Sequence, residues 1–376
     1  MTTTGTDNSI SRTCLGDISN QVQFIQQQKA SVQMASSLKP TKPTLAVNPI
    51  VTNPTLVPSK LKKDVPSTTC TNNSTTNNSI TLSPPPSKKM PLSVYNSPKI
   101  DEKDTSDPQS CTEYIKDIVN HYRSIECKYL ADHNYMMKQT DLTPNMRAIL
   151  VDWLIDVHHK FNLVPETFFL TINIIDRFLS EKVISRQRLQ LVGITAMFIS
   201  SKYEEIASPA VQDFVKITKD AYTKEEVLRM ERIMLQVLDF NLTVASPNVF
   251  LKRYLKCGRC TELQTFIAMY LVELALMDYA LLEFTPSAWA CAAVYLAKHI
   301  TEDTEKWDFT LQYYTEKSED DVKPCARVLL RQLKKISSQR RDPVNKPLVA
   351  AVNKYKKENR LSASRVCAKM ADTVQF

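Results

Sequence analysis

The sequence predicts an all-α protein: a tandem pair of five-helix domains, preceded by one helix and a long disordered N-terminal tail. The 376 residues include only 4 Gly against 20 Pro. Apolar residues recur with a helical period from about residue 111, and helix starts there share one signature. A protein of strands and hairpins would need more Gly at positive-φ turns, and an enzyme with a phosphate-binding loop would need Gly-rich turns. Both classes are therefore largely excluded.

Residues 1–110 are predicted to form the disordered regulatory tail. They contain twelve of the 20 prolines and only two aromatic residues. Such a segment cannot bury enough apolar surface to offset the entropy lost on ordering. Ser83-Pro84 and Ser97-Pro98 fit sites for a proline-directed kinase, and they fit a plain Pro-rich linker equally well.

The helices are predicted in order from their start signals. A first helix covers 111–127, where apolar residues share one side. A Ser or Thr N-cap followed by Pro predicts helices over 144–162, 209–218, 247–257 and 286–300. Pro165 opens a helix over 165–180, Ser185 caps one over 186–205, and Thr223 with Glu226 forms a capping box for 224–239. Further helices fit 261–283, 307–315 and 319–337.

This order gives five helices, a short connection at 241–246 and five more helices. The third helix of each set is the most apolar and the richest in small side chains, which predicts a central position among its neighbours. The expected divisions are 111–242 for the first helix and N-terminal domain, 243–340 for the C-terminal domain, and 341–376 for a basic C-terminal segment.

Charge and cysteine usage indicate an intracellular protein without nucleic acid or membrane as a direct partner. Residues 1–110 are net +4, 111–330 are net −5 and 331–376 are net +9. Specific reading of nucleic acid would need basic residues on a folded face. The nine Cys have no regular spacing, no signal peptide precedes them, and no run approaches the roughly 20 apolar residues of a membrane span.

No pattern in the chain predicts a catalytic or metal site, and no cofactor is expected. His158 and His159 are adjacent on a helix and point in different directions. Cys257 and Cys260 form a lone CxxC, whereas a structural zinc site needs four ligands. An interaction protein is therefore the leading class, and an enzyme of unidentified type is the rival.

The helix over 144–162 is the most informative segment. Its apolar residues fall at helical spacing, which by itself favours a buried stripe. Val151 and Ile155 widen the apolar face of this helix beyond what one contact with the core needs. The alternative to a buried stripe is therefore that part of the face lines a surface groove. The residues of the stripe are Met146, Ile149, Leu150, Trp153, Leu154 and Val157.

Several blocks of sequence resemble the cyclin box, and the resemblance covers about 111–365. The blocks occur in family order at 146–154 (MRAILVDWL), 174–179 (IIDRFL), 189–193 (LQLVG), 201–206 (SKYEEI), 222–224 (YTK) and 228–231 (LRME). Tyr203 after Lys202, with LMDY at 276–279 and NKY at 353–355, is more similar to B-type, mitotic cyclins than to A-type cyclins.

The resemblance implies two tandem cyclin folds in a non-catalytic subunit. Such a subunit binds and activates a cyclin-dependent serine/threonine kinase for the G2/M transition, in nucleus and cytoplasm. In the family, residues at the positions of Lys202 and Glu231 contact the kinase around its regulatory helix. Lys202 would donate to carbonyls at the end of that helix, and Glu231 would orient it; the alternative is an ordinary solvated lysine. The expected kinase-binding residues are Lys202, Glu231, Tyr203, Glu205, Leu235 and Phe240.

The resemblance also implies a patch that docks Arg-x-Leu segments of substrates and inhibitors. Asp156 occupies the position at which an acidic residue of the family binds the Arg of the docked segment. Its side chain is one methylene shorter than the Glu of A-type cyclins. Trp153 is expected to be partly exposed in this patch, against the alternative that it is simply core. The expected patch consists of Met146, Ile149, Leu150, Trp153, Asp156 and Gln190.

Two segments resemble degradation signals. A match to a destruction box is formed by Arg12, Leu15, Ile18 and Asn20. A ubiquitin ligase of mitotic exit would bind this segment where the chain is accessible. Residues 357–359 (KEN) spell a second signal, although this is where the family's C-terminal segment packs on the core. A cyclin-fold transcription factor that binds nucleic acid or polymerase machinery is the rival function. It would need a basic stripe on 111–330, which is net −5.

Overall fold

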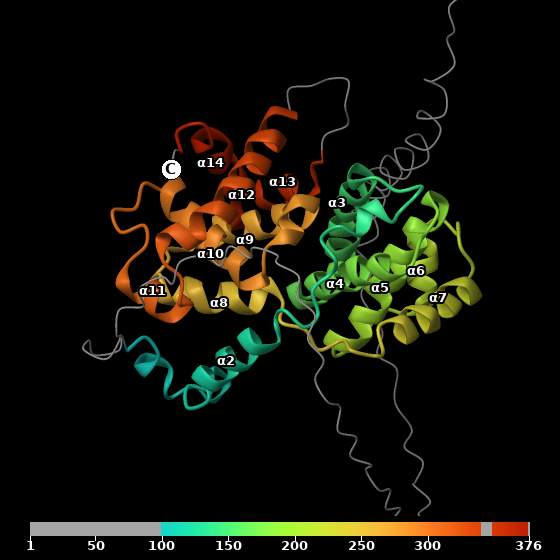
Figure 1. Ribbon diagram of the computed structural model, residues 1–376, viewed down its shortest axis with the longest axis horizontal. Helices are drawn as coiled ribbons and strands as arrows, with labels where there is room; N and C mark the ends of the chain where they lie inside the picture. The colour runs from blue at the N-terminus through green and yellow to red at the C-terminus, as the bar shows by residue number, and fades with distance from the viewer. Residues whose placement is uncertain (1–98, 340–347, 375–376) are drawn as a thin grey trace, which may run out of the picture. The chain divides into compact units, whose positions relative to one another are not determined.

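The computed structural model describes residues 99–339 and 348–374, and all regular secondary structure in these ranges is helical (Figure 1). The all-α prediction is therefore confirmed. The tail residues 1–98, including the destruction box at Arg12–Asn20, lie outside the described residues.

Two sets of five helices follow a preceding helix, α2 (Ile115–Ile125). The first set comprises α3 (Pro144–Phe161), α4 (Pro165–Glu181), α5 (Leu189–Glu204), α6 (Val211–Ile217) and α7 (Lys224–Val237). The second set comprises α8 (Pro247–Cys257), α9 (Glu262–Met277), α10 (Pro286–Ile300), α11 (Phe309–Thr315) and α12 (Glu319–Gln339). The number and order of helices in both sets agree with the sequence expectation.

Thr143, Thr223 and Thr285 cap their helices as predicted. Ser185 and Ser246 stand at the N-cap positions of Arg186–Arg188 and α8, but neither side chain makes a cap hydrogen bond, so the predicted cap at Ser185 is wrong. Thr143 accepts a hydrogen bond from the backbone N–H of Met146, and Thr223 forms the expected capping box with Glu226. The expectation for α6 is wrong by two residues: Ser208 and Pro209 do not open the helix. The hydroxyl of Ser208 is 2.8 Å from that of Ser201, and the chain stays extended through Ala210.

Two long predicted helices are interrupted. The segment at 186–205 starts with a 3₁₀ turn, η5 (Arg186–Arg188), before α5. The segment at 261–283 ends as a helix at Met277, and a separate 3₁₀ turn, η6 (Tyr279–Glu283), follows. Asp278 causes this second break, because its backbone is extended and its carboxylate accepts from the backbone N–H of Ala280 at 3.0 Å.

The third helix of each set is central, as predicted. Helix α5 contacts α3, α4, α6 and α7, whereas α10 contacts α8, α9, α12 and α14. From Leu191 to Ser201 every residue of α5 is buried. Small side chains permit this close packing: a Cβ placed on Gly193 would lie 2.8 Å from Cδ1 of Leu150 on α3.

Replacing Gly193 by Ala is expected to destabilise the protein in spite of the better helix propensity of Ala. The propensity gain is about 1 kcal/mol, and the added methyl must displace Leu150 at a cost of about 1–3 kcal/mol. Thermal melting should show a lower midpoint for the variant. Ser200→Ala on the same helix is the control. It removes a buried hydroxyl that has no partner among the described residues, so it should be neutral or stabilising. An unchanged melting point for Gly193→Ala would show that Leu150 moves freely.

A buried network around Arg147 joins the two sets of helices. Arg147 on α3 binds both carboxylate oxygens of Asp176 on α4, each at 2.6 Å. Its third nitrogen donates to the carbonyl of Leu276 on α9 at 2.8 Å, and Tyr135 donates to the same carboxylate at 2.9 Å. Because this network is almost inaccessible to water and well paired, it fixes α3 against both α4 and α9.

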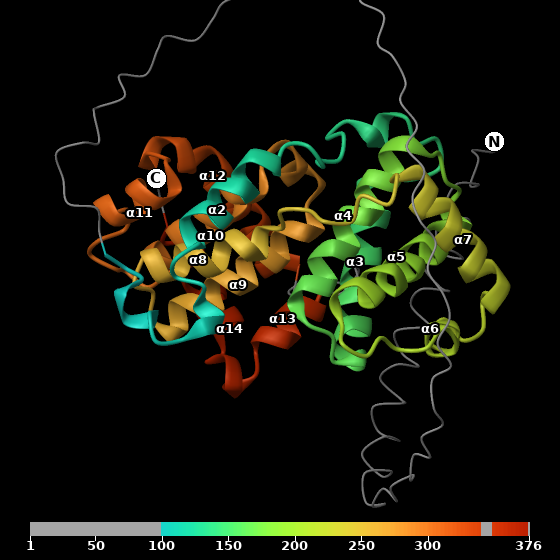
Figure 2. The same cartoon turned by 90° about the horizontal axis from the view of Figure 1, so that it is seen from below.

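The folded part extends beyond the expected limits at both ends. Asp101 accepts from Arg253 and Lys256 on α8, so ordered chain begins before the expected tail boundary at residue 110. At the other end, 348–374 forms α13 (Ala350–Tyr355), a 3₁₀ turn η7 (Glu358–Arg360) and α14 (Ala363–Met370). Helix α13 contacts α3 and α9, and α14 contacts α9 and α12. Figure 2 shows α13 and α14 below α9. These two short helices were not predicted.

Candidate functional site

The structure brings Lys202 and Glu231 together at the surface of the first helix set. Lys202 lies in the last turn of α5, and its ammonium forms an ion pair with the carboxylate of Glu231 on α7. The Glu231 side chain is 10% exposed, whereas that of Lys202 is 44% exposed. The Lys202 ammonium also lies 4.3 Å from the centre of the Phe198 ring. A buried acid therefore holds an accessible lysine in place.

Large exposed apolar side chains occur at the ends of the same two helices. Tyr203 is exposed after Lys202, and its hydroxyl hydrogen-bonds that of Thr243. Phe240 is 66% exposed and has a left-handed backbone with φ of 56°. Leu235 is half-buried, and Ile206 and Ile233, which the sequence analysis did not select, are exposed. Exposed apolar groups around a fixed charge are typical of a protein-binding surface.

Glu205 has an internal role that the sequence did not reveal. Its Oε1 atom accepts from the backbone N–H of Val164 at 2.8 Å and from the hydroxyl of Thr167 at 2.5 Å. These donors lie at the start of α4, which opens with Pro165 and has no side-chain cap of its own. Glu205 thus caps α4 from outside the helix, and its contact with a kinase stays a prediction.

The predicted docking residues differ in exposure. Met146, Ile149, Asp156 and Gln190 are half-buried, whereas Leu150 is 6% exposed and Trp153 is 4% exposed. The expectation that Trp153 is partly exposed is therefore wrong. Helix α3 contacts α5, α9 and α13, and the last of these helices was not anticipated. The indole N–H of Trp153 has no hydrogen-bond partner among the described residues. The docking role of the patch stays a prediction.

Asp152 links α3 to the C-terminal segment. One of its carboxylate oxygens accepts from the backbone N–H of Ala350 at 2.9 Å, which satisfies a donor at the start of α13. Burial raises the pKa of Asp152 to about 7, and the neighbouring carboxylate of Asp156 adds to the rise. A partner on the backbone of a distant segment leaves no signal in the sequence.

The KEN residues lie in folded chain. Lys357, Glu358 and Asn359 are exposed, and the last two belong to the 3₁₀ turn η7. The ammonium of Lys357 is 3.0 Å from Nε2 of His159 at the end of α3. A turn differs from the extended chain that a degradation signal is expected to present, and its use as a signal stays a prediction.

The described ranges contain no group of three or more His, Cys, Asp or Glu side chains placed to hold a metal ion. Cys257 and Cys260 are free thiols, and burial raises their pKa values to about 12 and about 11. Among the helices described, none is long and apolar enough to span a membrane.

Comparison with known families decides the identity of the fold. Residues 117–243 match the family described as "Cyclin, N-terminal domain", and residues 245–369 match "Cyclin, C-terminal domain". The chain belongs to the cyclin family. The junction of the two cyclin domains falls between α7 and α8, where the two helix sets meet in sequence.

The most similar curated cyclins include plant proteins with G2/mitotic and B-type names. The chain is 44% identical over 231 residues to "G2/mitotic-specific cyclin-1" of Medicago sativa subsp. varia, covering 61% of this chain and 54% of that protein. It is 41% identical to "Cyclin-B2-1" of Oryza sativa subsp. japonica, covering 61% and 55%. The matches thus span about half of these relatives. They confirm the resemblance to B-type cyclins.

A solved structure agrees on the fold. The viral cyclin from herpesvirus saimiri superposes with a TM-score of 0.52 at 20% identity, covering 57% of this chain and 96% of that one. At this identity the likeness concerns the arrangement of helices alone.

Proposed function

We propose that this cyclin is a regulatory subunit that binds and activates a cyclin-dependent serine/threonine kinase at the G2/M transition. The observation that carries the proposal is the accessible Lys202, fixed by the buried Glu231 and bordered by the exposed Tyr203 and Phe240. Family membership and the mitotic names of the relatives support it.

The physical basis lies in how kinases are switched on. A protein kinase is active when a Glu on its regulatory helix pairs with the catalytic Lys. The last carbonyls of any helix lack partners within the helix, and an ammonium can donate up to three hydrogen bonds to such groups. Lys202 would donate to these carbonyls, and the apolar side chains around it would pack on the regulatory helix and hold it inward.

Co-purification with kinase activity tests the proposal. The full chain is mixed with a purified cyclin-dependent kinase, and complex formation and phosphorylation of a short peptide are measured together. A stable complex with strongly increased activity is expected. A chain that folds, as judged by helical circular dichroism, but neither binds nor activates any member of a panel of such kinases would overturn the proposal.

Docking of Arg-x-Leu segments is the second part of the proposal. Support comes from burial: Met146 and Ile149 are half-buried apolar residues of α3, and Asp156 and Gln190 are half-buried polar residues. Such a patch would select substrates and inhibitors for the bound kinase. We place the protein in nucleus and cytoplasm, where such a kinase would meet its substrates.

Degradation by a ubiquitin ligase at mitotic exit is the third part. Changing Arg12 and Leu15 together to Ala should extend the lifetime of the protein at mitotic exit and leave kinase activation unchanged, because both residues precede the folded domains. Half-lives in a cycling extract measure the effect. The matched control replaces Arg340 and Leu348 by Ala, which removes the same side chains elsewhere. Equal half-lives for wild type and the Arg12/Leu15 variant would contradict the destruction box, and residues 357–359 would be tested next.

A further inference from the structure

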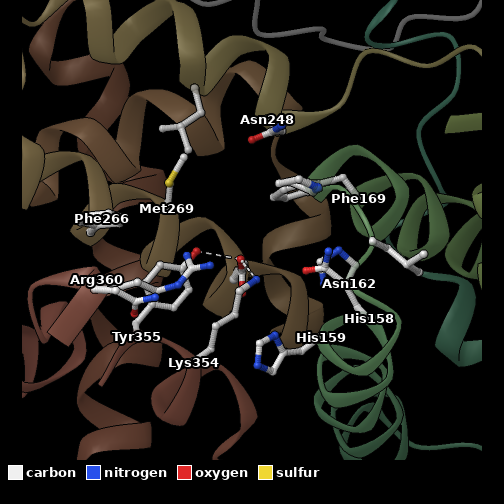
Figure 3. Close-up of a pocket in the computed structure, with 15 residues that line it drawn as sticks. His158, His159, Asn162, Phe169, Asn248, Phe266, Met269, Lys354, Tyr355 and Arg360 are labelled. Carbon is white, nitrogen blue, oxygen red and sulfur yellow. Dashed lines mark hydrogen bonds and ion pairs between the residues drawn. The ribbon is translucent and has the colours of Figure 1, made fainter. Parts of the chain in front are cut away.

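A cavity with no assigned role lies where the end of α3 and the start of α4 approach α8, α9 and the C-terminal segment. Its volume is about 360 Å³, within the range of ligand-binding pockets. Lys354, Tyr355 and Arg360 face His158, Asn162 and Phe169 across it (Figure 3). The kinase-binding residues and the docking patch contribute nothing to its lining.

One wall of the cavity is apolar, and the cavity is large enough to take a large side chain. Phe169 comes from α4, Leu251 from α8, and Phe266 and Met269 from α9. Phe266 and Met269 are only half-buried, so the apolar wall continues to the opening. Three amide side chains, those of Asn162, Asn248 and Asn359, also line it. Amides donate and accept hydrogen bonds, which suits the backbone of a bound peptide.

Among the charged side chains that line the cavity, one pair neutralises itself and one cation has no described ion-pair partner. Glu273 is buried, and its Oε1 accepts from the ammonium of Lys354 at 2.5 Å and from the hydroxyl of Tyr355 at 2.8 Å. This ion pair cancels within the wall. Arg360 stacks on the Tyr355 ring at 4.8 Å and has no ion pair in the part of the chain that the structure describes. The ammonium of Lys357 lies 3.0 Å from Nε2 of His159.

We propose that this cavity binds an acidic–apolar pair of side chains from an extended segment of a substrate or regulator of the kinase complex. The apolar side chain enters between Phe169, Phe266 and Met269. The adjacent carboxylate pairs with Arg360, whose planar guanidinium suits bidentate binding of a carboxylate. Only the identity of the partner depends on the proposed kinase function; the binding itself does not.

Peptide binding to the full chain, measured without kinase, tests the site. The probe is a short fluorescein-labelled peptide of Gly and Ser with Asp-Asp-Leu-Phe at its centre, followed by fluorescence anisotropy. Control peptides carry Lys-Lys-Leu-Phe or Asp-Asp-Ala-Ala. Saturable binding of the acidic–apolar peptide is expected, with at least about tenfold weaker binding of both controls. Equal binding of all three peptides, or none, overturns the proposal.

Variants of the chain locate the binding to the cavity. Arg360→Glu should weaken binding of the acidic–apolar peptide at least about tenfold, because the charge of the site is reversed. For the same reason it should strengthen binding of the Lys-Lys-Leu-Phe peptide. Met269→Trp should weaken binding of both peptides, because the larger side chain fills part of the cavity. The matched control is Lys356→Glu, which makes the same charge change on an exposed residue of the same segment that does not line the cavity.

The outcomes separate this proposal from the proposed function. Equal weakening by Arg360→Glu and Lys356→Glu would show general charge attraction and overturn the site. Thermal melting of each variant reports whether it folds. If Arg360→Glu unfolds the C-terminal segment, Met269→Trp still tests the site. Loss of kinase activation in Lys202→Asp with unchanged peptide binding would confirm that the two surfaces are independent.

Discussion

Replacement of Lys202 by Asp is expected to abolish binding to the kinase while the protein stays folded. The new carboxylate would face Glu231, which loses its only described ion-pair partner, and would repel the carbonyl groups that Lys202 is proposed to bind. An unpaired charge at a buried interface costs about 3–5 kcal/mol, enough to weaken binding by more than a hundredfold. Co-purification with the kinase measures binding, and helical circular dichroism reports folding.

Lys160→Asp is the matched control for Lys202→Asp. Lys160 is exposed in the last turn of α3 and makes no ion pair with the described residues, so the same change of charge should leave binding unaltered. Wild-type affinity of the Lys202→Asp variant would refute the assignment of this surface to the kinase.

Replacement of Trp153 by Ala is expected to cause the largest loss of stability. The ring is 4% exposed, and truncation of a buried Trp costs about 3–5 kcal/mol because a large cavity remains. The melting temperature should fall by many degrees, and kinase activation should fall on every substrate. This outcome reverses the expectation from the sequence, which treated Trp153 as a partly exposed wall of the docking patch.

Trp153→Phe separates packing from docking. Phe retains most of the buried ring and removes the indole N–H that has no described partner, so the loss of stability should be small. Activity is then compared on matched substrates with and without an Arg-x-Leu segment. An almost unchanged melting temperature for Trp153→Ala, with activity lost only on the Arg-x-Leu substrate, would contradict burial and restore the docking role.

The sequence predicted the helices well where local chemistry decides them. Thr143 and Pro144 start α3, and Thr223 with Glu226 starts α7, because capping depends on residues within one turn. Ser208 failed as a start signal because its hydroxyl bonds Ser201, a residue of the preceding helix. A residue suited to capping does not reveal whether a tertiary partner competes for it.

The C-terminal helices were missed for a different reason. Helix α13 has six residues and α14 has eight, which is too short for a clear periodic pattern, and they lie in a segment with a high positive charge. Their stability comes from packing on α3 and α9. Helix α3, which carries Trp153, is one of the helices that α13 contacts, so its surroundings were incompletely predicted.

The surface around Lys202 was better anticipated than the cavity. Lys202 and Glu231 were paired through a family resemblance, and their ion pair agrees with that pairing. Arg360, Glu273 and Phe169 come from three distant segments that share no motif, so only the fold brings them together. Sites assembled from single residues on separate helices are beyond the reach of motif reasoning.

The bond from Arg147 to the carbonyl of Leu276 has a consequence for how the molecule comes apart. The guanidinium is 1% exposed and belongs to the first domain, yet one of its acceptors belongs to the second. Separation of the domains would remove this hydrogen bond to a charged group, a loss of about 1.5–3 kcal/mol. The two family segments, although distinct in sequence, are therefore expected to melt in one cooperative step, and a fragment ending near residue 243 would be less stable than the same residues in the whole chain.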